Sequence, residues 1–239
     1  MKRTLGLLSL AVFATSTLHA AEWDYSVDRG PEHWGEHSSL CSEGKNQSPI
    51  DINSSVMADV DELKIDYQGQ VTGLTNNGHT LEGSLNGTNT LFVDGRQFEL
   101  KQFHFHTPSE NLLKSRQFPL EAHFVHANSQ GNLAVVAVMF EQGNDSHELE
   151  RLVEKVPMKV ETVKLEQAFD VQGLLPSLDE YYRFNGSLTT PPCSEGVRWI
   201  VLKETKRLSE QQVITLNTAM GNNNRPVQPQ NARLVLKNQ

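Results

Sequence analysis

The chain has 239 residues, of which 37% are hydrophobic and 21% are charged. This size and composition are typical of a soluble globular protein with a substantial apolar core. The formal net charge of −8 leaves no basic excess to contact a phosphate backbone, which argues against nucleic acid as a partner.

Residues 1–20 have the organisation of a cleavable export signal. A positive start at Lys2 and Arg3 is followed by an apolar run over residues 5–13, and a small or polar stretch ends at Ala20. The apolar run is too short to span a bilayer, so we expect a signal peptide rather than a membrane anchor. The alternative is a buried N-terminal helix.

The two cysteines, Cys41 and Cys193, both lie beyond this segment. An even cysteine count in an exported protein favours a disulfide. Such a bridge would close most of the mature chain into one loop and would restrict the unfolded state. The alternative is a pair of buried free thiols.

The remaining residues, 21–239, are predicted to form one domain, because they contain no internal repeat, linker or low-complexity tract. Short β-like runs alternate with Gly, Asn and Pro, and this texture favours a mainly β fold of the α+β class. We predict two strands around an Asp-Gly turn over 91–98, strands over 100–106, 120–127 and 133–140, a turn over 75–78, and helices that begin at Ser146 and Ser209.

Two of these predicted strands carry histidines in a pattern that can bind a metal. Strand alternation places His104 and His106 on one face of the first strand, and Phe103 and Phe105 on the other face. His123 lies on the second strand, and the three imidazoles converge if the two strands are neighbours. Three histidines leave a fourth position for water, which is the catalytic arrangement for zinc.

Polar residues accompany these histidines at a regular spacing. Gln102 precedes His104 by two positions and Glu121 precedes His123 by two, so each shares a face with its histidine and can accept a ring N–H. The competing interpretation is coincidence, because the chain has nine histidines and a lone His-x-His pattern arises easily from composition. His126 faces away from His123, and we interpret it as structural.

A third segment, residues 184–192, combines hydroxyl groups with a Pro-Pro corner. A rigid loop of this kind can present Thr189 and Thr190 to a ligand on a metal. The signal is weak by itself, because Thr-Pro loops are common.

Several separate motifs, in order along the chain, resemble the α-class carbonic anhydrases of the exported bacterial kind. The resemblance extends from Trp23 to about Val235 and covers nearly all of the mature chain. It implies a large, mostly antiparallel, twisted central sheet of about ten strands with short peripheral helices. It also implies a zinc lyase that hydrates CO₂ reversibly to bicarbonate and a proton through zinc-bound hydroxide. The matching stretches are residues 30–34, 47–51, 76–79, 102–106, 121–126, 187–192 and 224–229.

The resemblance implies roles at the reaction centre, residue by residue. Thr189 resembles a gate that accepts the proton of the hydroxide and donates its own proton to Glu110. Thr190 would help to hold bicarbonate. The implied zinc ligands are His104, His106 and His123, and the acceptors for their second ring nitrogens are Gln102, Glu121 and the backbone carbonyl of Asn223.

Further roles implied by the resemblance concern the substrate and the proton. His79 resembles a proton shuttle. The alternative interpretation is that His79 is an ordinary solvent-exposed histidine in a turn. Its path would be lined by Tyr25, Asn77 and Gln102, and the CO₂ pocket by Val125, Val135, Leu188, Val197 and Trp199. Cys41 and Cys193 match the disulfide of exported members, and the 48–49 and 191–192 peptide bonds match bonds that are cis in the family.

Two other function classes compete with this interpretation. A cupin metalloenzyme would also contain a His-x-His pattern followed by a carboxylate, as in His104, His106 and Glu110, but the glycines that frame the cupin motif are missing. Metal analysis separates the two, because cupins usually hold iron or manganese, whereas three histidines without a carboxylate favour zinc. The other class is an exported binding module without activity, and an enzyme assay distinguishes it from an active enzyme.

The expected partners follow from the same interpretation. They are the small molecules CO₂ and bicarbonate, with neither nucleic acid nor a membrane anchor, and the enzyme is expected to be sensitive to sulfonamides. The location is expected to be periplasmic or secreted. A homodimer is compatible with the sequence, which does not set the oligomeric state.

Overall fold

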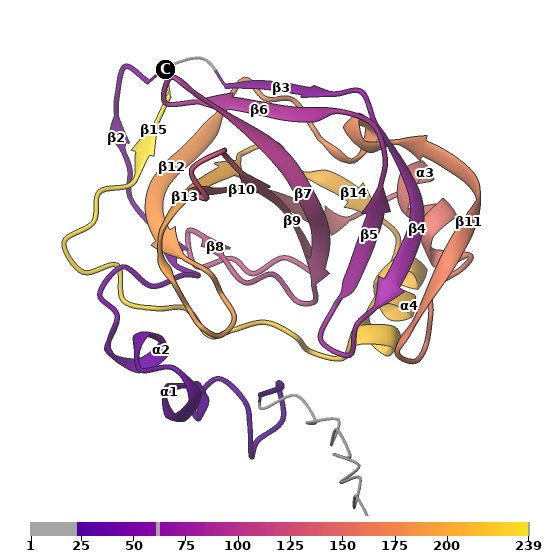
Figure 1. The fold of residues 1–239 in the computed structure, drawn as a ribbon, viewed down its shortest axis with the longest axis horizontal. Helices are drawn as coiled ribbons and strands as arrows, with labels where there is room; N and C mark the ends of the chain where they lie inside the picture. The colour runs from indigo at the N-terminus through magenta and orange to yellow at the C-terminus, as the bar shows by residue number, and fades with distance from the viewer. Residues whose placement is uncertain (1–22, 61–62, 239) are drawn as a thin grey trace, which may run out of the picture.

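The computed structural model describes residues 23–60 and 63–238, and one large twisted sheet dominates it (Figure 1). In this part of the chain the sheet has 13 strands, ten of which follow one another edge to edge. In that order the ten are β11 (Glu161–Asp170), β4 (Gln70–Asn76), β5 (Leu81–Leu85), β7 (Arg96–His106), β9 (Leu120–Ala127), β10 (Leu133–Gln142), β13 (Glu195–Leu202), β12 (Tyr181–Ser187), β15 (Leu236–Lys237) and β2 (Val56–Met57).

The other strands lie beside this path or apart from it. β3 (Lys64–Tyr67), β6 (Asn89–Val93) and β14 (Lys206–Leu208) pair at its sides, and β1 (Asp51–Ile52) with β8 (Leu112–Leu113) forms a small parallel sheet. In the large sheet the pairs are antiparallel except for β10 with β13, β10 with β14, and β15 with β2. The predicted mainly β, mostly antiparallel fold is therefore confirmed.

The predicted hairpin around the Asp-Gly turn is also confirmed. β6 and β7 pair antiparallel up to Val93 and Arg96, and Asp94 and Gly95 between them have φ angles of 51° and 66°. Positive φ at both central residues matches the twist of the flanking strands, which is why Asp-Gly favours this turn. The hairpin leads directly into the strand that carries two of the candidate metal ligands.

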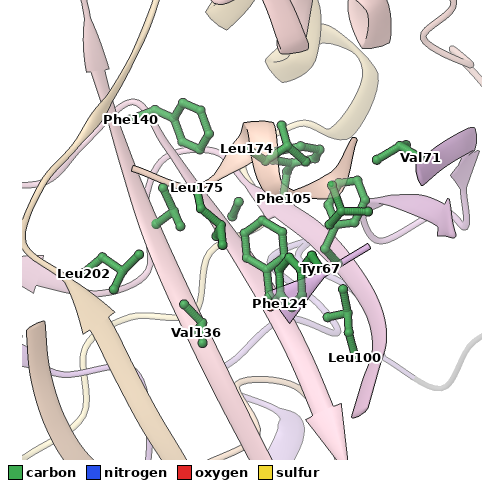
Figure 2. Close-up of a cluster of buried hydrophobic side chains, with 14 of the residues drawn as sticks. Tyr67, Val71, Leu100, Phe105, Phe124, Val136, Phe140, Leu174, Leu175 and Leu202 are labelled. Atoms are coloured by element: carbon green, nitrogen blue, oxygen red, sulfur yellow. The ribbon is translucent and has the colours of Figure 1, made fainter. Parts of the chain in front are cut away.

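A different apolar core packs on each face of the sheet. Phe103 and Phe105 of β7 and Phe124 of β9 lie in the larger core, as Figure 2 shows for Phe105 and Phe124. Val135 of β10 and Trp199 of β13 lie in the second core. Because neighbouring residues of a strand face opposite sides, the histidines of β7 face the side of the second core. β10 is buried along most of its length, as its apolar sequence predicts.

Short helices surround the sheet, as predicted. They are α1 (Trp34–His37), α2 (Leu40–Glu43), α3 (His147–Val153), α4 (Glu210–Met220) and the 3₁₀ helix η1 (Val171–Leu174). Figure 1 shows α3 and α4 together near β11, with α1 and α2 elsewhere. Ser146 caps α3, and Ser209 with Gln212 forms the predicted capping box of α4. Within the described ranges no helix has the length and apolar character to cross a membrane.

The predicted disulfide is present between Cys41 of α2 and Cys193, which rules out two free thiols. It ties the N-terminal segment to the loop that carries Thr189 and Thr190. The Ser48–Pro49 and Pro191–Pro192 bonds are cis, as expected, and Thr107–Pro108 is a third cis bond that was not expected. The predicted signal peptide, residues 1–20, lies outside the described residues.

Candidate metal centre

The three candidate ligands converge because β7 and β9 are antiparallel neighbours. The pairing places His104 directly opposite His123. One ring nitrogen of each histidine lies within 4.8 Å of the corresponding nitrogens of the other two. The ring centroids are 4.9 Å apart for His104 and His106, 5.4 Å for His104 and His123, and 4.5 Å for His106 and His123.

The second nitrogen of each ring is held by an acceptor. His104 Nδ1 lies 2.7 Å from Gln102 Oε1, and His106 Nδ1 lies 2.7 Å from the backbone oxygen of Asn223. His123 Nε2 lies 2.8 Å from Glu121 Oε1. Because amide, backbone and carboxylate oxygens only accept, each of these nitrogens must carry the proton and donate it. The unprotonated nitrogens that remain are His104 Nε2, His106 Nε2 and His123 Nδ1.

The surroundings keep the three imidazoles neutral. Burial, together with the neighbouring imidazoles, lowers the pKa of His104 and of His123 well below the ordinary value, and burial lowers the pKa of His106. Among the described residues, His106 Nε2 is buried without a hydrogen-bond partner. A buried unprotonated nitrogen without a donor is costly unless a metal ion binds it. Three neutral nitrogens without a carboxylate fit zinc better than iron or manganese.

Glu121 is held by a residue that the sequence did not reveal. Asn111 donates its side-chain N–H to Glu121 Oε1 at 2.7 Å and its backbone N–H to Oε2 at 2.9 Å. The backbone N–H of Glu110 donates to the same Oε2 at 2.7 Å. These bonds orient the carboxylate toward His123. No spacing or motif distinguished Asn111, because its role depends on the turn after β7.

Glu110 is a carboxyl group buried to 1% exposure between the histidines and the 187–193 loop. Its Oε1 accepts the backbone N–H of Arg225 at 2.8 Å and lies 3.5 Å from His106 Nδ1. Burial raises the pKa of Glu110 well above its usual range, and the hydrogen bond from the Arg225 backbone and the nearby Thr189 side chain oppose that rise. Thr189 is therefore close enough to Glu110 to influence its pKa, although Glu110 Oε2 is buried without a hydrogen-bond partner among the described residues. The gate itself stays a prediction.

The apolar residues predicted to line the substrate pocket gather in one place. The second core contains Val135, Val197 and Trp199, and Val125 and Leu188 pack against it. The Trp199 ring lies edge-on to His123, with centroids 4.9 Å apart, and its Nε1–H donates to the backbone oxygen of Ser187 at 3.0 Å. An uncharged surface therefore adjoins the metal centre. Thr190, in the same loop, is half-buried.

His79 lies in the loop after β4 and stacks on Trp23, with ring centroids 4.1 Å apart. Burial lowers its pKa, and within the described part of the chain its Nδ1 has no hydrogen-bond partner. Asn77 Oδ1 accepts the backbone N–H groups of His79 and Thr80, both at 2.9 Å, so it shapes the turn. Tyr25 packs edge-on against Trp23. The role of Trp23 was not predicted, although it begins the stretch of resemblance.

Comparisons with known proteins agree with this geometry. Residues 29–239 match the family model described as eukaryotic-type carbonic anhydrase. A carbonic anhydrase of Neisseria gonorrhoeae is 44% identical over 247 residues, which cover 98% of each chain. The solved α-carbonic anhydrase of Photobacterium profundum is 58% identical with a TM-score of 0.88, covering 90% of this chain and all of that one. The α-carbonic anhydrase of Thermovibrio ammonificans, solved with the inhibitor sulfanilamide, is 46% identical with a TM-score of 0.87, covering 91% of this chain and 99% of that one. The chain belongs to the α-class carbonic anhydrases.

Proposed function

We propose how the residues of this α-carbonic anhydrase carry out the reversible hydration of CO₂ to bicarbonate and a proton, a reaction for which the enzyme uses zinc. The observation that carries the proposal is the set of three inward ring nitrogens, one of which, His106 Nε2, is buried without a partner among the described residues. In the proposal His104, His106 and His123 hold the ion. Gln102, Glu121 and the backbone of Asn223 fix the tautomer and the orientation of the three rings.

His104, His106 and His123 would hold zinc as three neutral imidazoles, and the ion would lower the pKa of a bound water to about 7 and so supply hydroxide at neutral pH. The protein must then direct that hydroxide at carbon. In the proposal the Thr189 hydroxyl would donate a hydrogen bond to Glu110, and its oxygen would be left to accept a hydrogen bond from the attacking hydroxide. This arrangement selects one orientation of the nucleophile before CO₂ arrives and lowers the entropic cost of alignment.

The substrate is bound by apolar contact. CO₂ has no charge and weak hydrogen-bonding groups, so an apolar slot suits it, and the cluster around Val197 and Trp199 supplies one beside His123. Val125, Val135 and Leu188 complete this surface and exclude water. In the proposal Thr190 hydrogen-bonds to bicarbonate, the polar product.

The proton released in the reaction leaves through His79. Histidine is the side chain whose ordinary pKa suits exchange with buffer near neutrality. In the proposal it receives the proton through waters along Tyr25, Asn77 and Gln102. The partly exposed ring at Trp23 supports this role, because the group must reach solvent.

We further propose that residues 1–20 are a signal peptide and that 21–239 form the exported catalytic domain, located in the periplasm or outside the cell. The Cys41–Cys193 disulfide supports an oxidising compartment. Mass spectrometry of the protein recovered from its cell tests the cleavage after Ala20. Light scattering determines the oligomeric state and shows whether the protein forms a homodimer.

Stopped-flow CO₂ hydration by metal-analysed protein tests the central proposal. We expect about one zinc per chain, because the three histidines form a single site, and we expect a sulfonamide to abolish the activity. His123→Ala should lose most of the zinc and nearly all activity, whereas His147→Ala, an exposed residue of α3, should change neither. Full CO₂ hydration by the His123→Ala variant would remove His123 from the site.

A further inference from the structure

Arg225 is buried to 1% exposure and lies behind the proposed gate. Its guanidinium donates to the backbone oxygen of Cys41 at 2.7 Å, to Gln47 Oε1 at 2.9 Å and to the backbone oxygen of Ser48 at 2.8 Å. Its backbone N–H donates to Glu110 Oε1 at 2.8 Å. One residue therefore contacts both the N-terminal segment and the carboxyl group of the gate.

The acceptors of the Arg225 guanidinium in turn hold both ends of the 187–193 loop. Gln47 Nε2–H donates to the backbone oxygen of Cys193 at 3.0 Å, at the end of the loop. At its start, Ser48 N–H donates to Ser187 Oγ at 2.9 Å and Ser187 N–H donates to Ser48 Oγ at 3.2 Å. Thr189 lies between these two anchored ends. Hydrogen bonds and the Arg225 side chain thus connect the loop that carries Thr189 to Glu110, the acceptor of the proposed gate.

The chemistry of the position favours arginine over an apolar residue of similar size. A buried guanidinium is costly unless its donors are satisfied and a negative charge is close. Here three backbone or amide oxygens accept from it, and Glu110 is the carboxyl group that interacts with it electrostatically. The planar, forked donor of arginine can reach three acceptors at once, here from α2 and from the adjacent residues Gln47 and Ser48.

We propose that Arg225 is a positioning residue for CO₂ hydration, which sets the Thr189 hydroxyl against the Glu110 carboxyl by holding the 187–193 loop and Glu110 in one register. The inference rests on the proposed gate and adds a residue that touches neither the substrate nor the metal ligands. A misplacement of about an ångström in such a gate can cost up to about a hundredfold in rate.

A double-mutant cycle on kcat/KM for CO₂ tests the inference, with the zinc content of every variant measured. We expect Arg225→Leu to keep its zinc and to lower kcat/KM by about tenfold. In a Thr189→Ala background the same change should lower it by less than about twofold, because the gate is already lost. Arg183→Leu removes another buried arginine, which pairs with Asp94 instead, and should leave kcat/KM unchanged.

Two further variants separate positioning from folding. Arg225→Lys keeps a charge and several donors and should recover part of the lost rate. If Arg225→Leu does not fold, Gln47→Leu breaks the link to Cys193 while Arg225 stays in place, and its cost should likewise vanish in the Thr189→Ala background.

The outcomes are distinct for the gate and for Arg225. The positioning role would be overturned if Arg225→Leu, or Gln47→Leu, lowered kcat/KM by the same factor in the wild-type and the Thr189→Ala backgrounds. It would also be overturned if Arg225→Leu left kcat/KM unchanged in the wild-type background. If Thr189→Ala alone keeps the full rate, the gate fails and the role of Arg225 fails with it. If Thr189→Ala slows the enzyme but the cycle is additive, the gate stands and only Arg225 is excluded.

Discussion

Two histidines of β9 show how single residues acquire opposite roles in one strand. His123 donates Nε2–H to Glu121 and keeps Nδ1 free for a metal. His126, on the other face, has Nδ1 at 3.3 Å from the backbone oxygen of Ala134 and Nε2 at 2.6 Å from the hydroxyl of Tyr67. Nδ1–H therefore donates to Ala134 and Nε2 accepts from Tyr67, so both nitrogens of His126 are satisfied without an ion. Its predicted structural role agrees with these contacts.

His126 should make the fold sensitive to acid. Burial lowers the pKa of His126 from 6.5 to about 4, so the unfolded chain binds this proton more readily than the folded protein. The stabilisation is complete above pH 6.5 and is lost as the pH falls toward 4, with a total of about 3 kcal/mol at 1.36 kcal/mol per pKa unit. Urea unfolding across this range should show a weaker pH dependence for His126→Gln than for the wild type.

A matched control for this experiment is His37→Gln, because His37 is exposed. That variant should keep the pH dependence of the wild type. Identical pH profiles for His126→Gln and the wild type would show that the proton taken up on unfolding belongs to other groups, and the interpretation of His126 would be wrong.

His79→Ala should separate proton transfer from the hydration step. We expect kcat to fall in weak buffer while kcat/KM for CO₂ is nearly unchanged, because the shuttle acts after bicarbonate forms. Small imidazole buffers should restore kcat, and His147→Ala, with its exposed histidine, serves as the control. A kcat that does not depend on buffer concentration in either protein would place the shuttle elsewhere.

At the scale of elements, the register between β7 and β9 creates the metal centre. His104 faces His123 and His106 faces Glu121 across the pair, after an irregularity between Leu100 and Gln102. A slip of one residue would turn every side chain of one strand to the opposite face. The phenylalanines between the histidines oppose such a slip, because they are buried in the larger core.

The two longer helices are joined by one buried side chain. Gln212 Oε1 accepts the backbone N–H of Ser146 at 2.9 Å and that of Ser209 at 3.1 Å, and its Nε2–H donates to the backbone oxygen of Ser146 at 2.8 Å. It therefore completes the capping box of α4 and also pairs with the backbone N–H and oxygen of Ser146, the residue that caps α3. The sequence predicted the first contact but not the second, because the second joins segments far apart in the chain.

Gln212→Ala should consequently cost more stability than an ordinary cap. It leaves one buried N–H group, one partly buried N–H group and one buried carbonyl without their partner, and we expect a loss of about 2–4 kcal/mol in the free energy of unfolding. Gln211→Ala, at the exposed neighbouring position, should change it by less than about 0.5 kcal/mol. Chemical denaturation measures both, and equal effects would contradict the proposed link between the helices.

At the scale of the whole molecule, the Cys41–Cys193 bridge connects segments 152 residues apart. Closing so long a loop in the unfolded state stabilises the fold by up to about 5 kcal/mol in the chain-entropy model. The double variant Cys41→Ser with Cys193→Ser should therefore unfold at a lower denaturant concentration than the oxidised wild type. The reduced wild type is the natural control, and it should resemble the variant. Equal midpoints in all three would show that the bridge contributes nothing to stability.

Much of the fold and the centre of the site follow from local patterns in the sequence. Strand alternation placed His104 and His106 on one face, the Asp-Gly pair marked the hairpin, and Ser209 with Gln212 marked the start of α4. These features involve residues close together in the chain, where backbone geometry alone relates one side chain to the next. The resemblance to a family added roles, such as those of Thr189 and Glu110, that no local pattern could supply.

The tertiary structure decided which distant residues meet. Asn111 orients Glu121 through a turn, Trp23 stacks on His79, and Arg225 joins Glu110 to the N-terminal segment. No periodicity marks such residues, because their partners are set by strand order and loop paths rather than by spacing along the chain. A buried arginine looks like a surface residue in a sequence, and only the packing around it shows that its guanidinium donors are satisfied and that a carboxyl group interacts with its charge.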